Sequence, residues 1–137
     1  MPPASLTGKV AVVTGGSRGI GLAIAQALVA DGVQVAVIGR SDVHLSQARP
    51  RIEGAGPAPV ETLKADVRNH ADVERALSAT VARYGGLDIL INNAGVGIFK
   101  DVADMTPAEW SEVIDTNLTG VFNACHAALP KLRARGG

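Results

Sequence analysis

The 137-residue sequence has little of several features that mark particular classes of protein. Aromatic residues make up only 3% of it, too few for a surface that stacks nucleic-acid bases, and the 13 basic and 13 acidic residues cancel, unlike the basic surplus of most nucleic-acid binders. No apolar run approaches the roughly 20 residues that span a bilayer, and the N-terminus lacks a secretion signal. A single cysteine, Cys125, cannot form an internal disulfide, so we expect it to be a small core residue. These absences predict a cytoplasmic protein with neither nucleic acid nor membrane as a partner.

What the sequence does contain is a regular alternation of two kinds of segment. Short apolar runs at residues 10–13, 33–38, 60–64 and 87–91 predict buried strands. Helical spacing and capping signals predict helices at residues 19–31, 42–53 and 70–84. This alternation predicts a single α/β domain over residues 1–137, with a doubly wound, Rossmann-like parallel sheet between two helical layers. The expected local strand order is 3-2-1-4.

The last predicted helix has the clearest start signal. Residues 106–109, Thr-Pro-Ala-Glu, match a capping box with proline at the first helical position. An apolar stripe that includes Trp110 and Asn117 then predicts one buried face, and Pro130 predicts a kink or an early end. Because the classical fold has about six strands, we expect an incomplete domain, truncated after the fourth strand and this long helix. The fourth strand would then be an unprotected apolar edge.

A glycine-rich turn lies between the first predicted strand and the next helix. Residues 14–21 are Thr-Gly-Gly-Ser-Arg-Gly-Ile-Gly. A helix N-terminus offers unpaired N–H groups and the positive end of a dipole, which together attract a pyrophosphate. Gly15 would permit the tight turn, Gly19 the approach of phosphate, and Gly21 close packing on the sheet. The alternative is an ordinary glycine-rich loop, since the spacing departs from the commoner Gly-x-Gly-x-x-Gly form.

Polar or glycine-rich residues follow the other predicted strands as well. The tips are Gly-Arg-Ser at 39–41, Ala-Asp-Val at 65–67 and Asn-Asn-Ala-Gly at 92–95. Ligands of open α/β sheets bind outside the carboxyl ends of the strands. The four tips together therefore predict one nucleotide site.

The turn at 14–21, followed by the motif at 92–95, resembles the classical short-chain dehydrogenase/reductase family over essentially the whole chain. The resemblance implies an NAD(P)-dependent oxidoreductase that transfers hydride between nicotinamide and a small carbonyl or alcohol substrate, and a homo-oligomer for the complete enzyme. It also implies that Ser17, Arg18 and Ile20 line the phosphates and that Asp66 and Val67 lie beside adenine. Asn92, Ala94 and Gly95 would flank the adenosine side and steady the sheet. No metal ligand is predicted, and the predicted cofactor-binding residues are Thr14, Gly15, Ser17, Arg18, Gly19, Ile20, Gly21, Arg40, Ser41, Asp66, Val67, Asn92, Ala94 and Gly95.

The residues after the second strand favour NADP(H), with NAD(H) as the alternative. An NAD site usually carries a carboxylate there, which bonds the ribose hydroxyls. This sequence has Gly39 followed by Arg40, and a guanidinium would bind a 2′-phosphate. Arg18 adds a second cation at a helix N-terminus, where positive charge is unfavourable unless an anion is near. Asp42 is the main objection, but we expect it to cap the next helix.

Only part of the catalytic machinery that the resemblance implies is present. Asn117 lies on the apolar stripe, where a buried amide needs specific partners; in similar proteins it holds a water of the proton relay, and the alternative is an amide bonded to backbone at a helix kink. The family's Ser and Tyr-x-x-x-Lys are absent, because the single tyrosine, Tyr84, precedes the Asn-Asn-Ala-Gly motif and is followed four residues later by Asp88. We therefore expect the chain to be inactive alone. The alternatives are a non-catalytic nucleotide-binding module and a subunit completed by another chain.

Overall fold

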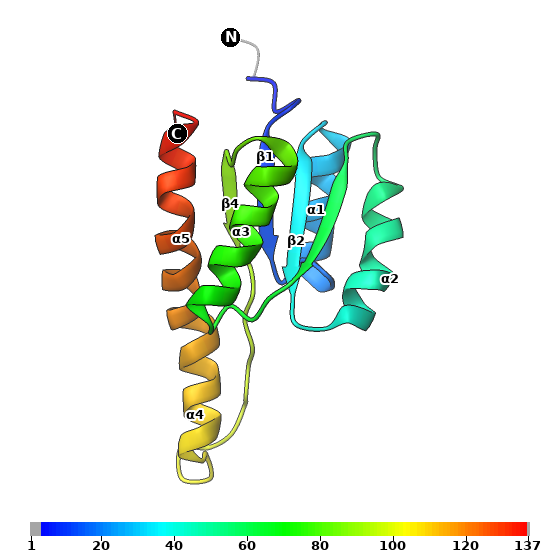
Figure 1. Cartoon of the computed structure of the whole chain (residues 1–137). Coiled ribbons are helices and arrows are strands. Elements are labelled where there is room, and N and C mark those ends of the chain that lie inside the picture. Colours follow the sequence, from blue (N-terminus) through cyan, green and yellow to red (C-terminus); the bar gives the residue numbers. More distant parts are fainter. Residues whose placement is uncertain (1–3, 137) are drawn as a thin grey trace.

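Four parallel strands form one sheet in the order β3-β2-β1-β4 (Figure 1). The computed structural model describes residues 4–136. Its strands are β1 (Val10–Thr14), β2 (Gln34–Gly39), β3 (Val60–Lys64) and β4 (Ile89–Asn92). Val12 of β1 is paired with Ala36 of β2 on one side and with Leu90 of β4 on the other. The predicted parallel sheet and strand order are thus confirmed.

Helices cover both faces of the sheet (Figure 1). Helices α1 (Gly19–Ala30) and α2 (Asp42–Glu53) pack on one face, and α3 (His70–Tyr84) and α5 (Gly120–Ala134) on the other. Alternate residues of β1 supply the two cores, because side chains of a strand point to opposite faces. Val10 and Val12 lie in the core under α3 and α5, whereas Ala11 and Val13 lie in the core under α1 and α2. This three-layer arrangement confirms the doubly wound prediction.

The ends of the helices follow from local chemistry. The Ser41 hydroxyl accepts a hydrogen bond from the His44 N–H at the start of α2, so Ser41 and not Asp42 is the cap. Gly85 ends α3 in the left-handed region at φ +87°, where glycine is favoured. The capping box at Thr106 and Glu109 is formed and opens α4 (Pro107–Ile114).

The final helical stretch differs from the prediction. A π-helical segment, η1 (Asp115–Thr119), separates α4 from α5, and Pro130 lies inside α5 without ending it. A π-turn takes up about one extra residue, which rotates the following side chains by about 100°. Apolar side chains spaced at 3.6 residues per turn therefore lie on one face of the helix before η1 and on a different face after it. The early end at Pro130 and the single buried stripe were both wrong.

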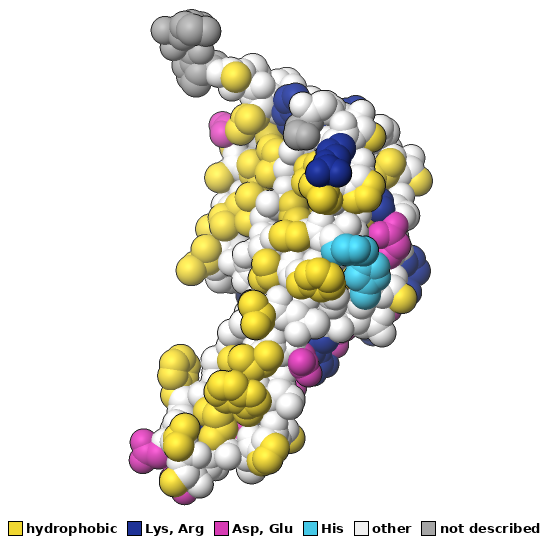
Figure 2. All heavy atoms as spheres, turned by 90° about the vertical axis from the view of Figure 1, so that its left-hand side faces the viewer, with side chains coloured by type: hydrophobic (Ala, Val, Ile, Leu, Met, Phe, Trp, Pro, Cys, Tyr) yellow, Lys and Arg dark blue, Asp and Glu magenta, His cyan; other side chains and the backbone are white. Residues whose placement is uncertain are grey.

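The apolar residues of this stretch lie partly at the surface. Figure 2 shows hydrophobic side chains gathered over the side of the molecule formed by α4 and α5. Trp110 is 59% exposed, and Phe122, Leu118 and Leu129 are also exposed. Cys125 is exposed as well, so its placement in the core was wrong. Between residues 4 and 136, no helix is both long and apolar enough to cross a membrane, and the cytoplasmic location stays a prediction.

A partly buried carboxylate lies at the amino end of the sheet. Asp88, whose side chain is 9% exposed, accepts a hydrogen bond from the Val10 N–H at 2.9 Å and pairs with Arg135 at 3.0 Å. The hydrogen bond from Arg135 holds the pKa of Asp88 below its ordinary value, although burial opposes this shift. Asp88 therefore joins the start of β1 to the end of α5 in its charged form.

We expect Asp88→Ala to lower the free energy of unfolding at pH 7 by about 1–3 kcal/mol, because the Val10 N–H loses its partner. A lowered folded-state pKa gives stability that is present above the unfolded pKa and is lost as pH falls through the folded pKa. Urea unfolding should therefore show the gap between wild type and variant closing below about pH 4. The exposed Asp104→Ala is the control, and a gap of constant size at all pH values would contradict this account.

Candidate functional site

A cavity of about 690 Å³ opens at the carboxyl ends of the four strands. Its walls come from the turn after β1, the tips of the other three strands, and η1. The volume falls within the about 300–1,000 Å³ that is typical of small-molecule sites. The structure thus brings the four predicted strand tips together around one hollow. The predicted residues that line it are Gly15, Ser17, Arg18, Gly19, Ile20, Arg40, Ser41, Val67, Ala94 and Gly95.

The glycine turn is fastened to the tip of β4. The buried Thr14 hydroxyl accepts hydrogen bonds from the N–H groups of Asn93 and Ala94, at 3.2 and 3.1 Å. The Asn93 amide donates to the Gly15 carbonyl at 3.0 Å. A Cβ on Gly21 would clash with that amide and with the Gly15 carbonyl, which explains the glycine there. Thr14 and Gly21 are thus not part of the cavity lining, but their contacts fix the position of the glycine turn that lines it. Asn93 contacts both residues, and the sequence analysis did not single it out.

The start of α1 leaves donors and space beside the cavity. Arg18 occupies the N-cap position and, among residues 4–136, its side chain accepts no capping hydrogen bond; the first turn also has no acidic residue. Gly19 has φ +55°, a conformation that favours glycine, and a Cβ there would meet no described atom within 4 Å. An anionic group could thus approach the N–H groups of the first turn closely.

The charge of the lining is positive. Arg18 and Arg40 both line the cavity, and no carboxylate does so among the described lining residues. The Asp42 carboxylate instead bonds Lys64 Nζ at 2.6 Å. The two predicted arginines thus line one common hollow.

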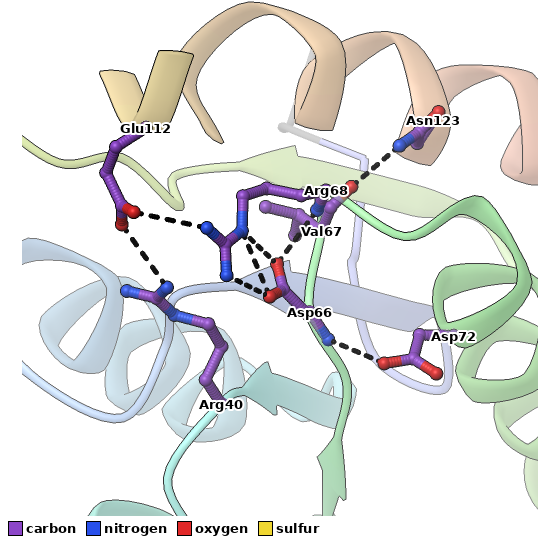
Figure 3. A network of polar contacts seen from close by, with 7 residues as sticks. All are labelled: Arg40, Asp66, Val67, Arg68, Asp72, Glu112 and Asn123. Carbon is purple, nitrogen blue, oxygen red and sulfur yellow. Dashed lines mark hydrogen bonds and ion pairs between the residues drawn. The ribbon is translucent and has the colours of Figure 1, made fainter. Parts of the chain in front are cut away.

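The Arg40 guanidinium belongs to a polar network at the rim of the cavity (Figure 3). Glu112 on α4 reaches Arg40 at 3.5 Å and Arg68 at 3.2 Å. Arg68 also chelates both oxygens of Asp66, with contacts of 2.6–3.0 Å, and this interaction lowers the pKa of Asp66. Asp66 does not line the cavity, and its carboxylate faces Arg68. No spacing in the sequence connects Glu112 with Arg40, since the two lie far apart in the chain and meet only in the fold.

Two predicted asparagines have unexpected surroundings. Asn117 is exposed, not buried, because η1 turns it away from the core. Its amide accepts from the Val96 N–H and donates to the Val96 carbonyl, each at 2.8 Å, which agrees with the interpretation of an amide bonded to backbone. Asn92 donates to Cys125 Sγ at 3.3 Å and does not line the cavity.

Thr116, next to Asn117, lines the cavity and was missed by the sequence analysis. It is 5% exposed, and its hydroxyl has no hydrogen-bond partner among the described residues. A buried hydroxyl without a partner is costly. Thr116 therefore contributes to the cavity wall while its hydroxyl oxygen is itself shielded from solvent.

Other side chains of possible chemical interest lie outside the cavity lining. The Tyr84 ring packs on the core under α3 and α5, and burial raises the pKa of its hydroxyl. His70 Nε2 and His126 Nδ1 are 3.0 Å apart at the surface, although the sequence showed no relation between them. None of these three residues contributes to the cavity.

Comparisons with known proteins agree with this geometry. The profile of a family described as short chain dehydrogenase matches residues 9–137. The chain is 42% identical over 125 residues to a 3-dehydrosphinganine reductase of Arabidopsis thaliana, covering 91% of this chain and 37% of that protein. It is 37% identical to a D-beta-hydroxybutyrate dehydrogenase of Cupriavidus necator, covering 95% of this chain and 50% of that protein.

Solved structures show the same likeness. An L-sorbose reductase from Gluconobacter frateurii, crystallised with NADPH and L-sorbose, superimposes with a TM-score of 0.91 at 30% identity. The match covers 97% of this chain and 51% of that structure. The chain thus spans between about a third and a half of the length of these relatives.

We expect Thr14→Val to lower the free energy of unfolding by about 1–3 kcal/mol, because two N–H groups at the tip of β4 lose their acceptor. Thr14→Ser keeps the hydroxyl and should stay within about 1 kcal/mol of wild type, the loss coming from one methyl group. Urea unfolding followed by circular dichroism measures both. A larger loss for Thr14→Ser than for Thr14→Val would show that the methyl group, and not the hydroxyl, matters at this position.

Proposed function

This chain belongs to the short-chain dehydrogenase family, and on that premise we propose that its cavity binds a nicotinamide dinucleotide, NADP(H) in preference to NAD(H). The proposed activity of the whole protein is hydride transfer between the nicotinamide and a small carbonyl or alcohol substrate. The observation that carries the proposal is the cavity at the strand tips, with Arg18 and Arg40 in its lining and no carboxylate among the described lining residues.

The residues present fit such a cofactor. The open space at Gly19 and the uncapped first turn of α1 suit a pyrophosphate, which helix N-termini bind through N–H groups and the dipole. When bound, the nicotinamide would give hydride to the substrate or accept it. Residues 15–20 would hold the phosphates, with Val67 and Ala94 lining the adenosine part.

Preference for the phosphorylated cofactor rests on Arg40. It follows β2, where an NAD site usually has a carboxylate that bonds the ribose hydroxyls. A guanidinium there would pair with a 2′-phosphate in a forked geometry. The L-sorbose reductase that resembles this chain was crystallised with NADPH, which supports the same choice.

Asn117 is proposed to act in proton transfer through a water, as the family resemblance implies. Its two hydrogen bonds to Val96 fix the amide beside the segment that follows β4. They also hold η1 against that segment, which continues from Gly95 in the cavity lining. Asn117 is therefore first a positioning residue for this wall of the cavity.

A second candidate function is a nucleotide-binding module without catalysis of its own. The observation that favours it is the position of Tyr84, the single tyrosine, outside the cavity lining. A phenol that serves as general acid has to reach the substrate oxygen. A third candidate is a subunit completed by another chain, because β4 is the outer strand of the described sheet and pairs only with β1 there.

We expect Arg40→Ala to weaken NADP+ binding by about tenfold or more, because a charged hydrogen-bonding partner of the 2′-phosphate is lost. NAD+ affinity should change less than about twofold, since NAD+ lacks that phosphate. Isothermal titration of the 137-residue chain measures both, with the exposed Arg51→Ala on α2 as the matched control. Equal affinity of the wild type for the two dinucleotides would refute the preference.

The 137-residue chain should show no oxidation of NADPH in the presence of carbonyl compounds, because no tyrosine lines its cavity. The absorbance of NADPH at a near-ultraviolet wavelength reports this directly. Turnover that disappears in Asn117→Ala would contradict the expectation and would establish catalysis by this chain itself.

A further inference from the structure

We infer that Glu112 competes with the cofactor phosphate for Arg40 and so limits how strongly the cavity favours the 2′-phosphorylated dinucleotide. The inference rests on the proposed function, because it takes the cavity to be a dinucleotide site. It adds a residue on a different element, α4, that tunes the selectivity for which Arg40 is responsible.

The position of Glu112 is set by two guanidinium groups (Figure 3). One carboxylate oxygen, Oε1, lies 3.5 Å from Arg40 Nη1, and the other, Oε2, lies 3.2 Å from Arg68 Nη1. Arg40 comes from the tip of β2 and Arg68 from the segment after β3, so Glu112 closes a bridge between α4 and two strand tips. Arg40 thus has an anionic partner within the protein itself.

Arg68 and Arg40 differ in what else surrounds them. Arg68 chelates Asp66 through contacts of 2.6–3.0 Å, so its charge is already balanced and it serves to hold Glu112 in place. Arg40 has Glu112 as its one carboxylate partner within 4.0 Å among residues 4–136. Because Arg40 lines the cavity and Glu112 does not, a ligand reaches Arg40 from the cavity side while Glu112 holds it from the rim.

The charges determine the sign of the effect. A 2′-phosphate bears close to two negative charges, so it is repelled by Glu112 as it pairs with Arg40. The side chains of Arg40 and Glu112 are 48% and 36% exposed, so water and salt weaken both interactions. Removing the carboxylate should therefore raise affinity for NADP+ only moderately, by about three- to tenfold. NAD+ has hydroxyls at that position and should be nearly indifferent.

The competing hypothesis gives the opposite sign. If Glu112 instead aligned the Arg40 guanidinium for a phosphate, removing its charge would weaken NADP+ binding. Titration of one variant with both dinucleotides separates the two hypotheses.

The test is Glu112→Gln, which keeps the size of the side chain and one oxygen that can accept from Arg68. Isothermal titration of the 137-residue chain should show NADP+ binding about three- to tenfold tighter than in wild type, with NAD+ unchanged within about twofold. The gain should shrink at high salt. Asp104→Asn removes the same charge from an exposed turn and should leave both affinities unchanged. Glu112→Ala provides a second variant without the carboxylate, and thermal unfolding shows that each variant is folded.

A double-mutant cycle shows whether the effect passes through Arg40. In an Arg40→Ala background, Glu112→Gln should improve NADP+ binding by less than half of the factor seen in wild type, because the guanidinium for which Glu112 and the phosphate compete is gone. An undiminished factor would overturn the competition mechanism.

The outcomes distinguish this inference from the proposed function. A wild type that prefers NADP+, with Glu112→Gln equal or weaker, overturns the role of Glu112 alone. A wild type that binds neither dinucleotide, or binds them equally, overturns the proposed preference and the role of Glu112 together.

Discussion

The rest of the site depends on the hydrogen bonds that the Thr14 hydroxyl accepts from the N–H groups of Asn93 and Ala94. The first turn of α1 has to leave its N–H groups free for a ligand, so the loop that leads into it has to be held by other contacts. Thr14 and Asn93 do this by tying the turn after β1 to the tip of β4. The glycines then follow: Gly21 makes room for the Asn93 amide, and Gly19 keeps the approach to the helix open. The cavity keeps its shape because the segments that follow the neighbouring strands β1 and β4 are hydrogen-bonded to each other.

Charge around the cavity is arranged in two layers. Arg18 and Arg40 face the hollow, whereas the carboxylates that balance the surface lie behind or at the rim, where Arg68 holds both Asp66 and Glu112. An anionic ligand therefore meets positive charge first. The Glu112 carboxylate is close enough to Arg40 to weaken the attraction of Arg40 for an anionic ligand, because this ion pair is only partly screened by water. The affinity for a phosphate at this rim then depends on how strongly Arg40 pairs with the phosphate compared with the Glu112 carboxylate.

Sequence patterns predicted the fold well because each strand and each helix is marked by residues that lie close together in the sequence. Apolar runs, capping residues and the glycines at 32 and 85 mark strands and helix ends within a few residues of the observed ones, and the parallel order follows from the chirality of the crossovers. The π-helical segment left no such signature. Asn117 lies within it and is exposed, so the prediction that assumed an unbroken helix with one buried face failed there. Contacts between distant segments, such as Asn93 with Gly15 or Glu112 with Arg40, could not be derived, because no periodicity encodes them.

The central claim is that a dinucleotide lies in the hollow at the strand tips. The most direct test is to follow the backbone amide resonances of the 15N-labelled chain by NMR while NADP+ is added. The account predicts shifts concentrated at residues 15–20, 40–41 and 94–96, with the α3–α5 face unaffected. Shifts confined to that face, or none at saturating NADP+, would contradict it.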